Sequence, residues 1–125
     1  MKTSDYKQLQ VWQKGMDLTE EVYRLVKQLP REETFAMSDQ LRRAAVSVPS
    51  NIAEGHGRGT DKEFIKFLTI ARGSLLEVET QLLICNRLNL ISSSDSRLAQ
   101  SLIIEIGKML NALISYRCNS LRPKA

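Results

Sequence analysis

The chain has few of the residues that form turns or disulfides: of its 125 residues, six are Gly, three are Pro and two are Cys. A β-sandwich or β-barrel needs a turn about every dozen residues, so this shortage argues against both folds. Cys85 and Cys118 lie far apart and form no CxxC motif, which favours reduced thiols in the cytoplasm. The length predicts a single domain over residues 1–125, large enough to bury a core without crosslinks.

Histidine and long apolar runs are scarce as well. The one histidine, His56, excludes a histidine-rich metal site, and we expect neither a metal nor a cofactor. No apolar run approaches ~18 residues, so we expect no membrane span. The net charge of +4 is compatible with a polyanionic partner but does not require one.

Apolar residues recur at steps of three and four along almost the whole chain, which predicts amphipathic helices. The predicted helices cover about residues 9–29, 38–54, 61–90 and 95–118. Pro30 ends the first, and Pro49 predicts a kink or break in the second. Because the connections are short, successive helices should run antiparallel. The predicted fold class is therefore all-α, an up-down-up-down four-helix bundle.

Capping signals mark two helix starts and one turn. Ser38 is a candidate N-cap, and Thr60 with Glu63 reads as a capping box. The run GHGRG at 55–59 resembles an anion-binding loop before a helix, but no strand precedes it and no Gly-Lys-Ser/Thr follows. A helix C-cap and tight turn is the favoured interpretation.

The third and fourth predicted helices carry more apolar residues than one core stripe needs. Such a surplus usually marks an interface, which favours a homo-oligomer over a monomer with scattered surface leucines. The candidate interface residues are Ile65, Ile70, Leu76, Leu83, Ile84, Leu88, Ile103, Ile104, Leu110 and Ile114.

The predicted topology gathers most of the net charge at one end of the bundle. Seven basic residues share that end with Asp5, Glu54, Asp61 and Glu63; they are Lys2, Lys7, Arg58, Lys62, Arg117, Arg122 and Lys124. In a ring of subunits this surplus would multiply and attract a polyanion, although basic side chains also simply solvate helix ends. The candidate nucleic-acid contacts are Arg42, Arg43, Arg58, Lys62, Arg72 and Arg117.

Two of these arginines also have structural interpretations. Arg43, Ser47, Ser50 and Glu54 share a polar stripe that would contact a phosphate, a partner chain or only solvent. Arg117 falls within an apolar arc, so we expect it to reach out of the bundle end or to pair with Glu54.

No set of residues combines a general acid, a general base and an oxyanion donor. Glu77 and Glu79 point to different helix faces, and Cys85 lies on a core stripe. We therefore expect a protein that is not an enzyme.

The stretch 40–59, which reads QLRRAAVSVPSNIAEGHGRG, resembles the signature of the bacterial four helix bundle protein family. The runs LQVWQK at 9–14 and ARGSL at 71–75 are similar to the family pattern too. Members are encoded in intervening sequences of 23S ribosomal RNA genes and are often labelled S23 ribosomal proteins. His56 departs from the pattern, where an aromatic such as Tyr is expected.

The resemblance implies a homopentameric ring. It also implies a relationship to the accessory variability determinant of diversity-generating retroelements, a positively charged pentameric barrel that binds nucleic acid and its reverse transcriptase. Our leading hypothesis is a homo-oligomer that binds RNA or DNA, and whose further partner is a nucleic-acid-processing protein. The alternative is a protein–protein scaffold without a nucleic-acid role.

Overall fold

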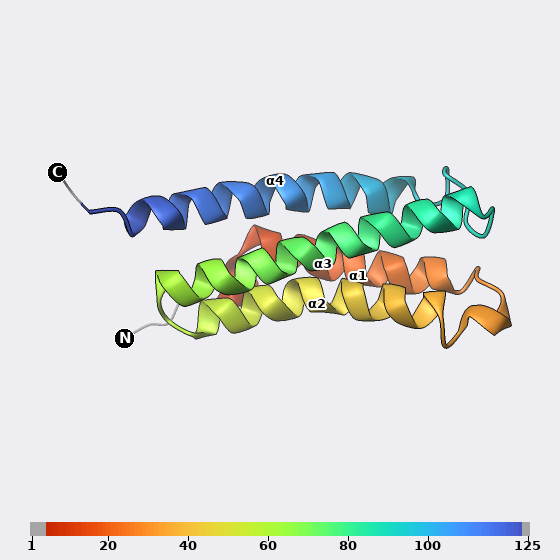
Figure 1. The fold of residues 1–125 in the computed structure, drawn as a ribbon, viewed down its shortest axis with the longest axis horizontal. Coiled ribbons are helices and arrows are strands. Elements are labelled where there is room, and N and C mark those ends of the chain that lie inside the picture. Colours follow the sequence, from red (N-terminus) through yellow and green to blue (C-terminus); the bar gives the residue numbers. More distant parts are fainter. Residues whose placement is uncertain (1–4, 124–125) are drawn as a thin grey trace.

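Residues 5–123 are described by a computed structural model, and within this range the chain forms helices and no strand. The elements in chain order are η1 (Tyr6–Gln8), α1 (Gln10–Val26), η2 (Arg31–Glu33), α2 (Met37–Gly57), α3 (Asp61–Arg87) and α4 (Arg97–Ser120). The four α-helices lie side by side as an elongated bundle (Figure 1). η1 and η2 are short 3-10 turns before α1 and α2.

Each long helix packs against two others. α2 contacts α1 and α3, and α4 contacts α1 and α3. Two side-chain hydrogen bonds cross between α2 and α3: Gln81 Nε2 donates to Gln40 Oε1 at 3.4 Å, and the hydroxyls of Ser47 and Ser74 lie 2.7 Å apart. From the first pair to the second, the residue number rises from 40 to 47 on α2 and falls from 81 to 74 on α3.

The predicted core stripes are largely confirmed. In α1 and α2, the stripe residues Leu18, Val22, Leu41 and Val48 are fully buried. The α3 stripe is buried throughout, and its members are Phe64, Phe67, Leu68, Ala71, Leu75, Val78, Leu82 and Cys85. The α4 stripe is buried only in its first half, because Tyr116 is mostly exposed. Helical periodicity thus locates the core, except towards the end of α4.

The ends of α1 and the start of α2 differ from the sequence prediction. α1 ends at Val26 rather than at residue 29, because Gln28 and Leu29 donate to carbonyls three residues back, as in a turn. α2 begins at Met37, and Ser38 is a buried residue inside it rather than the cap. The side chain of Glu33 accepts from the Met37 N–H at 3.4 Å instead.

α2 is longer than predicted at its C-terminus. It runs to Gly57 instead of residue 54, so the first two glycines of the GHGRG run are helical. The turn is made by Gly59, whose φ of +86° suits a residue without a side chain. The Thr60 cap is confirmed, because its hydroxyl accepts from the Glu63 N–H at 3.2 Å.

α3 ends at Arg87, three residues before the predicted end. Asn89 takes a positive φ of 58°, the Leu90 N–H donates to Cys85 O at 2.9 Å, and the Asn89 N–H donates to Asn86 O at 3.1 Å. This pair of bonds is a Schellman motif with Asn in the place usually taken by Gly. α4 starts at Arg97 and ends at Ser120, each two residues later than predicted.

The predicted break at Pro49 does not occur, and α2 is continuous across it. Gly15 of α1 faces Pro49, and a Cβ at position 15 would lie 3.4 Å from Pro49 Cβ, in van der Waals contact. The hydroxyl of Thr19 donates to the α2 carbonyl that Pro49 leaves without its helical partner.

Candidate functional site

Arg58, Lys62 and Arg117 lie at the same end of the bundle, where α2 passes into α3 and α4 ends (Figure 1). Arg58 Nη2 lies 2.7 Å from Glu54 Oε2, and its Nη1 lies 3.9 Å from Glu63 Oε1. The hydrogen bond to Glu54 raises the pKa of the Arg58 guanidinium, so this side chain stays charged. Arg58 therefore forms ion pairs with two carboxylates of the same chain.

Arg117 does not pair with Glu54, as one of the two interpretations of the sequence expected. Its Nη1 lies 2.7 Å from Asp61 Oδ1, and its guanidinium lies 5.1 Å from the centre of the Phe64 ring. The reason is that α2 continues to Gly57, which leaves the first turn of α3 as the acidic neighbour of the α4 end. Arg117 thus joins α4 to α3.

The other three candidate arginines lie away from this end. Arg42 Nη2 donates to the Thr34 carbonyl at 3.4 Å, near the start of α2. Arg43 pairs with Asp39 at 3.3 Å, and its side chain is 80% exposed. Arg72 Nη1 donates to Asn111 Oδ1 at 3.0 Å, between the middle of α3 and α4. The structure therefore brings three of the six candidate basic residues together, not all six.

Some of the positive charge at this end is not paired with a carboxylate: within residues 5–123, Lys7 and Arg122, both predicted for this end, form no ion pair. Lys62 and Lys66 are exposed one helical turn apart on α3, and within residues 5–123 neither forms an ion pair. Lys66 was not among the predicted contacts, although its i,i+4 spacing from Lys62 was a readable signal. Of the other basic residues predicted for this end, Lys2 and Lys124 lie outside the described residues.

Most of the predicted interface residues are exposed, but two are not. Ile103 is 3% exposed and Leu110 is 0% exposed, so the prediction that they face a partner is wrong: both fill the core beside Ile106. Ile65 and Ile114 are half-buried. The large exposed members of the set are Ile70, Leu76, Leu83, Ile84, Leu88 and Ile104.

Three of the exposed residues flank the seam between α3 and α4. Leu76 and Leu83 follow Arg72 by four and eleven positions, and Ile104 precedes Asn111 by seven, so each lies on the helix face that the Arg72–Asn111 bond marks. Leu76 is 56% exposed, Leu83 50% and Ile104 57%. We call these three residues the α3–α4 patch.

The remaining three lie on the other flank of α3, towards α2. Ile70 and Ile84 are seven positions before and after Glu77, and Leu88 is eleven positions after it, so all share the face of Glu77. We call Ile70, Ile84 and Leu88 the α2–α3 patch. α3 thus exposes apolar surface on two separate flanks.

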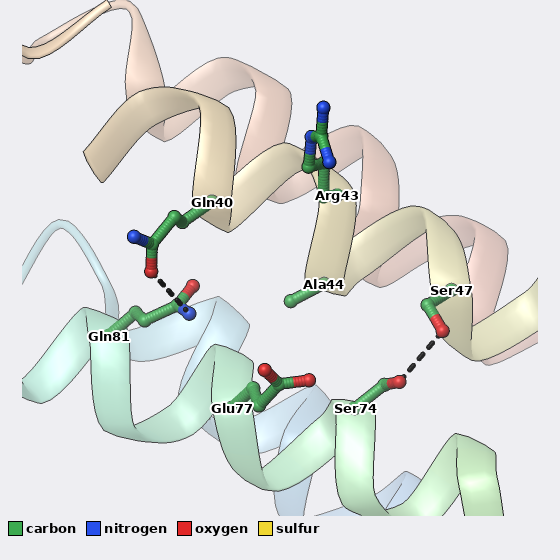
Figure 2. Close-up of a pocket in the computed structure, with 7 residues that line it drawn as sticks. All are labelled: Gln40, Arg43, Ala44, Ser47, Ser74, Glu77 and Gln81. Atoms are coloured by element: carbon green, nitrogen blue, oxygen red, sulfur yellow. Dashed lines mark hydrogen bonds between the residues drawn. The ribbon is translucent and has the colours of Figure 1, made fainter. Parts of the chain in front are cut away.

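A polar cavity of about 260 Å³ lies beside the α2–α3 patch (Figure 2). Its lining residues are Gln40, Arg43, Ala44, Ser47, Ser74, Glu77 and Gln81. The polar stripe predicted on α2 included Arg43 and Ser47, but the partners from α3 were missed. These partners are Ser74, Glu77 and Gln81, and their i, i+3 and i+7 spacing indicated that they share one face of the helix.

Two further features of the described residues bear on metal binding and on a membrane span. No group of three or more His, Cys, Asp or Glu could hold a metal ion within residues 5–123. One helix, α4, is long and apolar enough to cross a membrane by length and composition, with a mean hydropathy of 1.2. A mostly buried core helix passes the same test, but only 28% of this stretch is buried. The buried part includes Leu102, Ile106 and Leu110.

The fold and these surfaces define an all-helical, four-helix bundle protein with exposed apolar flanks and a polar cavity between two helices. The chain matches the family model of the 23S rRNA-intervening sequence protein over residues 7–112, and it belongs to this family. The resemblance drawn from residues 40–59 is thereby confirmed.

A solved structure supports the same fold. A protein of unknown function from the S23 ribosomal protein family of Bacteroides thetaiotaomicron VPI-5482 is 25% identical and superposes with a TM-score of 0.74. The match covers 83% of this chain and 97% of that chain. No curated protein matches the chain.

Proposed function

We propose that this chain is a non-enzymatic, cytoplasmic protein that assembles as a pentameric ring and binds RNA or DNA through a basic surface. Its subunit is an antiparallel, up-down-up-down bundle, which the crossed pairs between α2 and α3 support. The observation that carries the proposal is that α3 exposes two separate apolar patches, one on each flank.

The two patches favour a ring over a symmetric dimer. In a cyclic assembly with more than two subunits, each subunit uses two different surfaces, one for each neighbour. The α3–α4 patch and the α2–α3 patch are two such surfaces, and burying their large apolar side chains against a neighbour favours association because it removes apolar area from water. A homo-oligomer therefore explains why these leucines and isoleucines are exposed in one chain.

Sedimentation or light scattering tests the assembly. We expect a solution mass close to five times the 14.2 kDa of the chain. Leu76→Glu should reduce that mass, because it places a charge in the proposed contact. Leu98→Glu is the matched control, since Leu98 is an equally exposed leucine outside both patches. A monomeric wild-type protein at micromolar concentration would refute the assembly.

Nucleic-acid binding rests on the end of the bundle with Lys62 and Lys66. There Arg58 and Arg117 pair with Glu54, Asp61 and Glu63, whereas Lys62 and Lys66 form no ion pair within residues 5–123. These four basic side chains exceed the three carboxylates by one positive charge. A ring repeats this surplus in every subunit, and the summed potential attracts a polyanion.

A salt titration of RNA affinity tests this part. Affinity should fall linearly with salt on logarithmic axes, because each phosphate contact releases condensed counterions. Replacing Lys62 and Lys66 with Ala should weaken binding and reduce the slope, whereas Lys27→Ala, at the other end, should not. Binding that is absent at low salt, or a slope unchanged by the double variant, would count against a nucleic-acid role.

A protein–protein scaffold is the second candidate. It is favoured by one observation: five of the six predicted basic contacts already have acceptors within the chain, at Thr34, Asp39, Glu54, Asn111 and Asp61. Under this function the ring would form normally, RNA binding would be absent, and a protein such as a nucleic-acid-processing enzyme would bind instead.

A further inference from the structure

The cavity between α2 and α3 is bounded along the bundle by two cross-helix hydrogen bonds. Gln40 and Gln81 are joined at one end, and Ser47 and Ser74 at the other (Figure 2). Ala44 lies between the two pairs on α2, and its small side chain leaves the space open towards α3. The result is a polar opening of about 260 Å³ on the side of the bundle.

Hydrogen-bond acceptors without donors dominate this opening. Glu77 is an exposed residue of α3 whose carboxylate projects into the opening, and within residues 5–123 that carboxylate has no hydrogen bond or ion pair (Figure 2). Gln81 Oε1 is buried, and within the same residues it accepts no hydrogen bond. A buried amide oxygen is normally satisfied by a donor, so Gln81 Oε1 is an unmet acceptor. The exposed Glu77 carboxylate is solvated and offers its negative charge to a cation.

Arg43, the basic residue of the cavity rim, does not fill this role. Its guanidinium pairs with Asp39 at 3.3 Å, and it projects away from α3 (Figure 2). The hydroxyl oxygen of Ser47 already accepts from Asn51 Nδ2 at 2.8 Å. The negative charge of Glu77 and the free oxygen of Gln81 therefore remain for a donor from outside the chain.

We propose that this cavity binds a guanidinium group carried on a short aliphatic chain. A guanidinium can hold a carboxylate with two parallel N–H bonds. It still has donors left for Gln81 Oε1, which is buried and becomes reachable when the Gln81 amide, held by a 3.4 Å bond to Gln40, turns towards the opening. Ile70 and Ile84 lie about 10 Å along α3 on either side of Glu77 and give the aliphatic part an apolar border. The group comes either from an arginine of a second copy or from a free small molecule, and nucleic-acid binding is not needed for it.

Agmatine, a guanidinium on a four-carbon amine chain, is the probe. Titrated into ¹⁵N-labelled protein, it should produce saturable shifts confined to the backbone near Ala44, Ser74, Glu77 and Gln81, with a dissociation constant on the order of 1 mM. Putrescine has the same carbon chain without the guanidinium, and it should bind at least about tenfold more weakly. Equal binding of the two compounds would overturn the proposal.

Three variants locate the site. Glu77→Gln keeps the shape but removes the charge, and should weaken agmatine about tenfold or more. Ala44→Leu should fill the opening and abolish binding. Glu79→Gln is the matched control: it removes a carboxylate two positions along α3, on a different face, and should leave the affinity unchanged. Agmatine shifts that persist in both Glu77→Gln and Ala44→Leu would overturn the proposal.

Sedimentation with and without agmatine separates the two sources. If an arginine of a second copy occupies the cavity, saturating agmatine and Glu77→Gln should both shift the protein towards smaller species. If the natural ligand is a free small molecule, agmatine should bind with no change in mass. If agmatine causes no saturable shifts and no change in mass, the proposed site is wrong. That result would not affect the assembly itself, which is measured without agmatine.

Discussion

The hydroxyl of Thr19 in α1 lies 3.1 Å from the carbonyl oxygen of Ala45 in α2. Four residues beyond Ala45 stands Pro49, which has no N–H to donate to that carbonyl. The Thr19 hydroxyl also lies 2.9 Å from Gly15 O in its own helix. The single hydroxyl hydrogen of Thr19 is therefore shared between Gly15 O and Ala45 O. A side chain of the neighbouring helix thus partly replaces the backbone donor that Pro49 lacks.

Removing that hydroxyl should destabilise the bundle. Thr19→Val keeps the shape of the side chain but leaves Ala45 O without a donor, at a cost of about 1–3 kcal/mol in the free energy of unfolding. Urea unfolding at a fixed protomer concentration measures it. Thr19→Ser should lose much less, because the hydroxyl is kept.

The Pro49→Ala background provides a sharper control for Thr19. Alanine at position 49 restores a backbone N–H for Ala45 O, so Thr19→Val should cost clearly less there than in the wild type. An equal cost in both backgrounds would mean that the threonine does not compensate for the proline.

The two glycines within the last turns of α2 should respond in opposite ways to alanine. A Cβ at Gly55 would lie 2.5 Å from Phe67 Cβ, whereas a Cβ at Gly57 meets nothing within 4 Å. Gly55→Ala should therefore destabilise by about 1–3 kcal/mol through overpacking. Gly57→Ala should be neutral or stabilise by up to about 1 kcal/mol, because alanine favours a helix. Thermal unfolding of both variants compares them, and similar shifts would contradict the close contact.

The core and the helices were predictable because they depend on local periodicity. Leu18, Leu41 and Leu82 all lie on stripes with helical spacing, and all are fully buried. Contacts between helices were harder to predict, because they depend on where each helix ends. Arg117 pairs with Asp61 rather than Glu54 because α2 runs three residues further than its glycines suggested.

The candidate site was predictable only in part, for the same reason. The stripe on α2 was visible in the sequence, but its partners on α3 depend on the register between the two helices. The Gln40–Gln81 and Ser47–Ser74 contacts set that register. Ile103 was misplaced because the fourth helix has a broad apolar arc, and periodicity alone does not divide such an arc between core and surface.

The two cysteines should differ in reactivity. Cys85 is fully buried and Cys118 is exposed. Burial, and next the charge of Glu33, raise the pKa of the Cys85 thiol. In native protein a thiol reagent should label Cys118 alone, and Cys85 only after unfolding. Labelling of Cys85 at the rate of Cys118 in the folded protein would contradict this burial.

The raised pKa of Cys85 also predicts a pH dependence of stability. The neutral Cys85 thiol makes its full contribution to the free energy of unfolding below the ordinary thiol pKa of about 8.5. That contribution is lost as the pH rises through the higher pKa of the folded state, because the thiol of the unfolded chain ionises first. The free energy of unfolding should therefore fall above about pH 8.5 in the wild type. The fall should be smaller in Cys85→Ala, and an unchanged slope would assign it to another group.

The ion pair of Asp61 with Arg117 should contribute more to stability than the pair of Asp39 with Arg43. Both side chains of the first pair are about two-thirds buried or more, their N–O distance is 2.7 Å, and the guanidinium also lies over Phe64. In the second pair the distance is 3.3 Å and the arginine is mostly exposed.

A double-mutant cycle with Asp61→Asn and Arg117→Gln should give a coupling free energy of about 1 kcal/mol, and the same cycle at Asp39 and Arg43 should give a value near zero. Added salt should reduce the first coupling by less than an exposed pair would lose, because each side chain is about two-thirds buried. A coupling near zero for Asp61 and Arg117 would show that Arg117 does not tie the end of α4 to the start of α3.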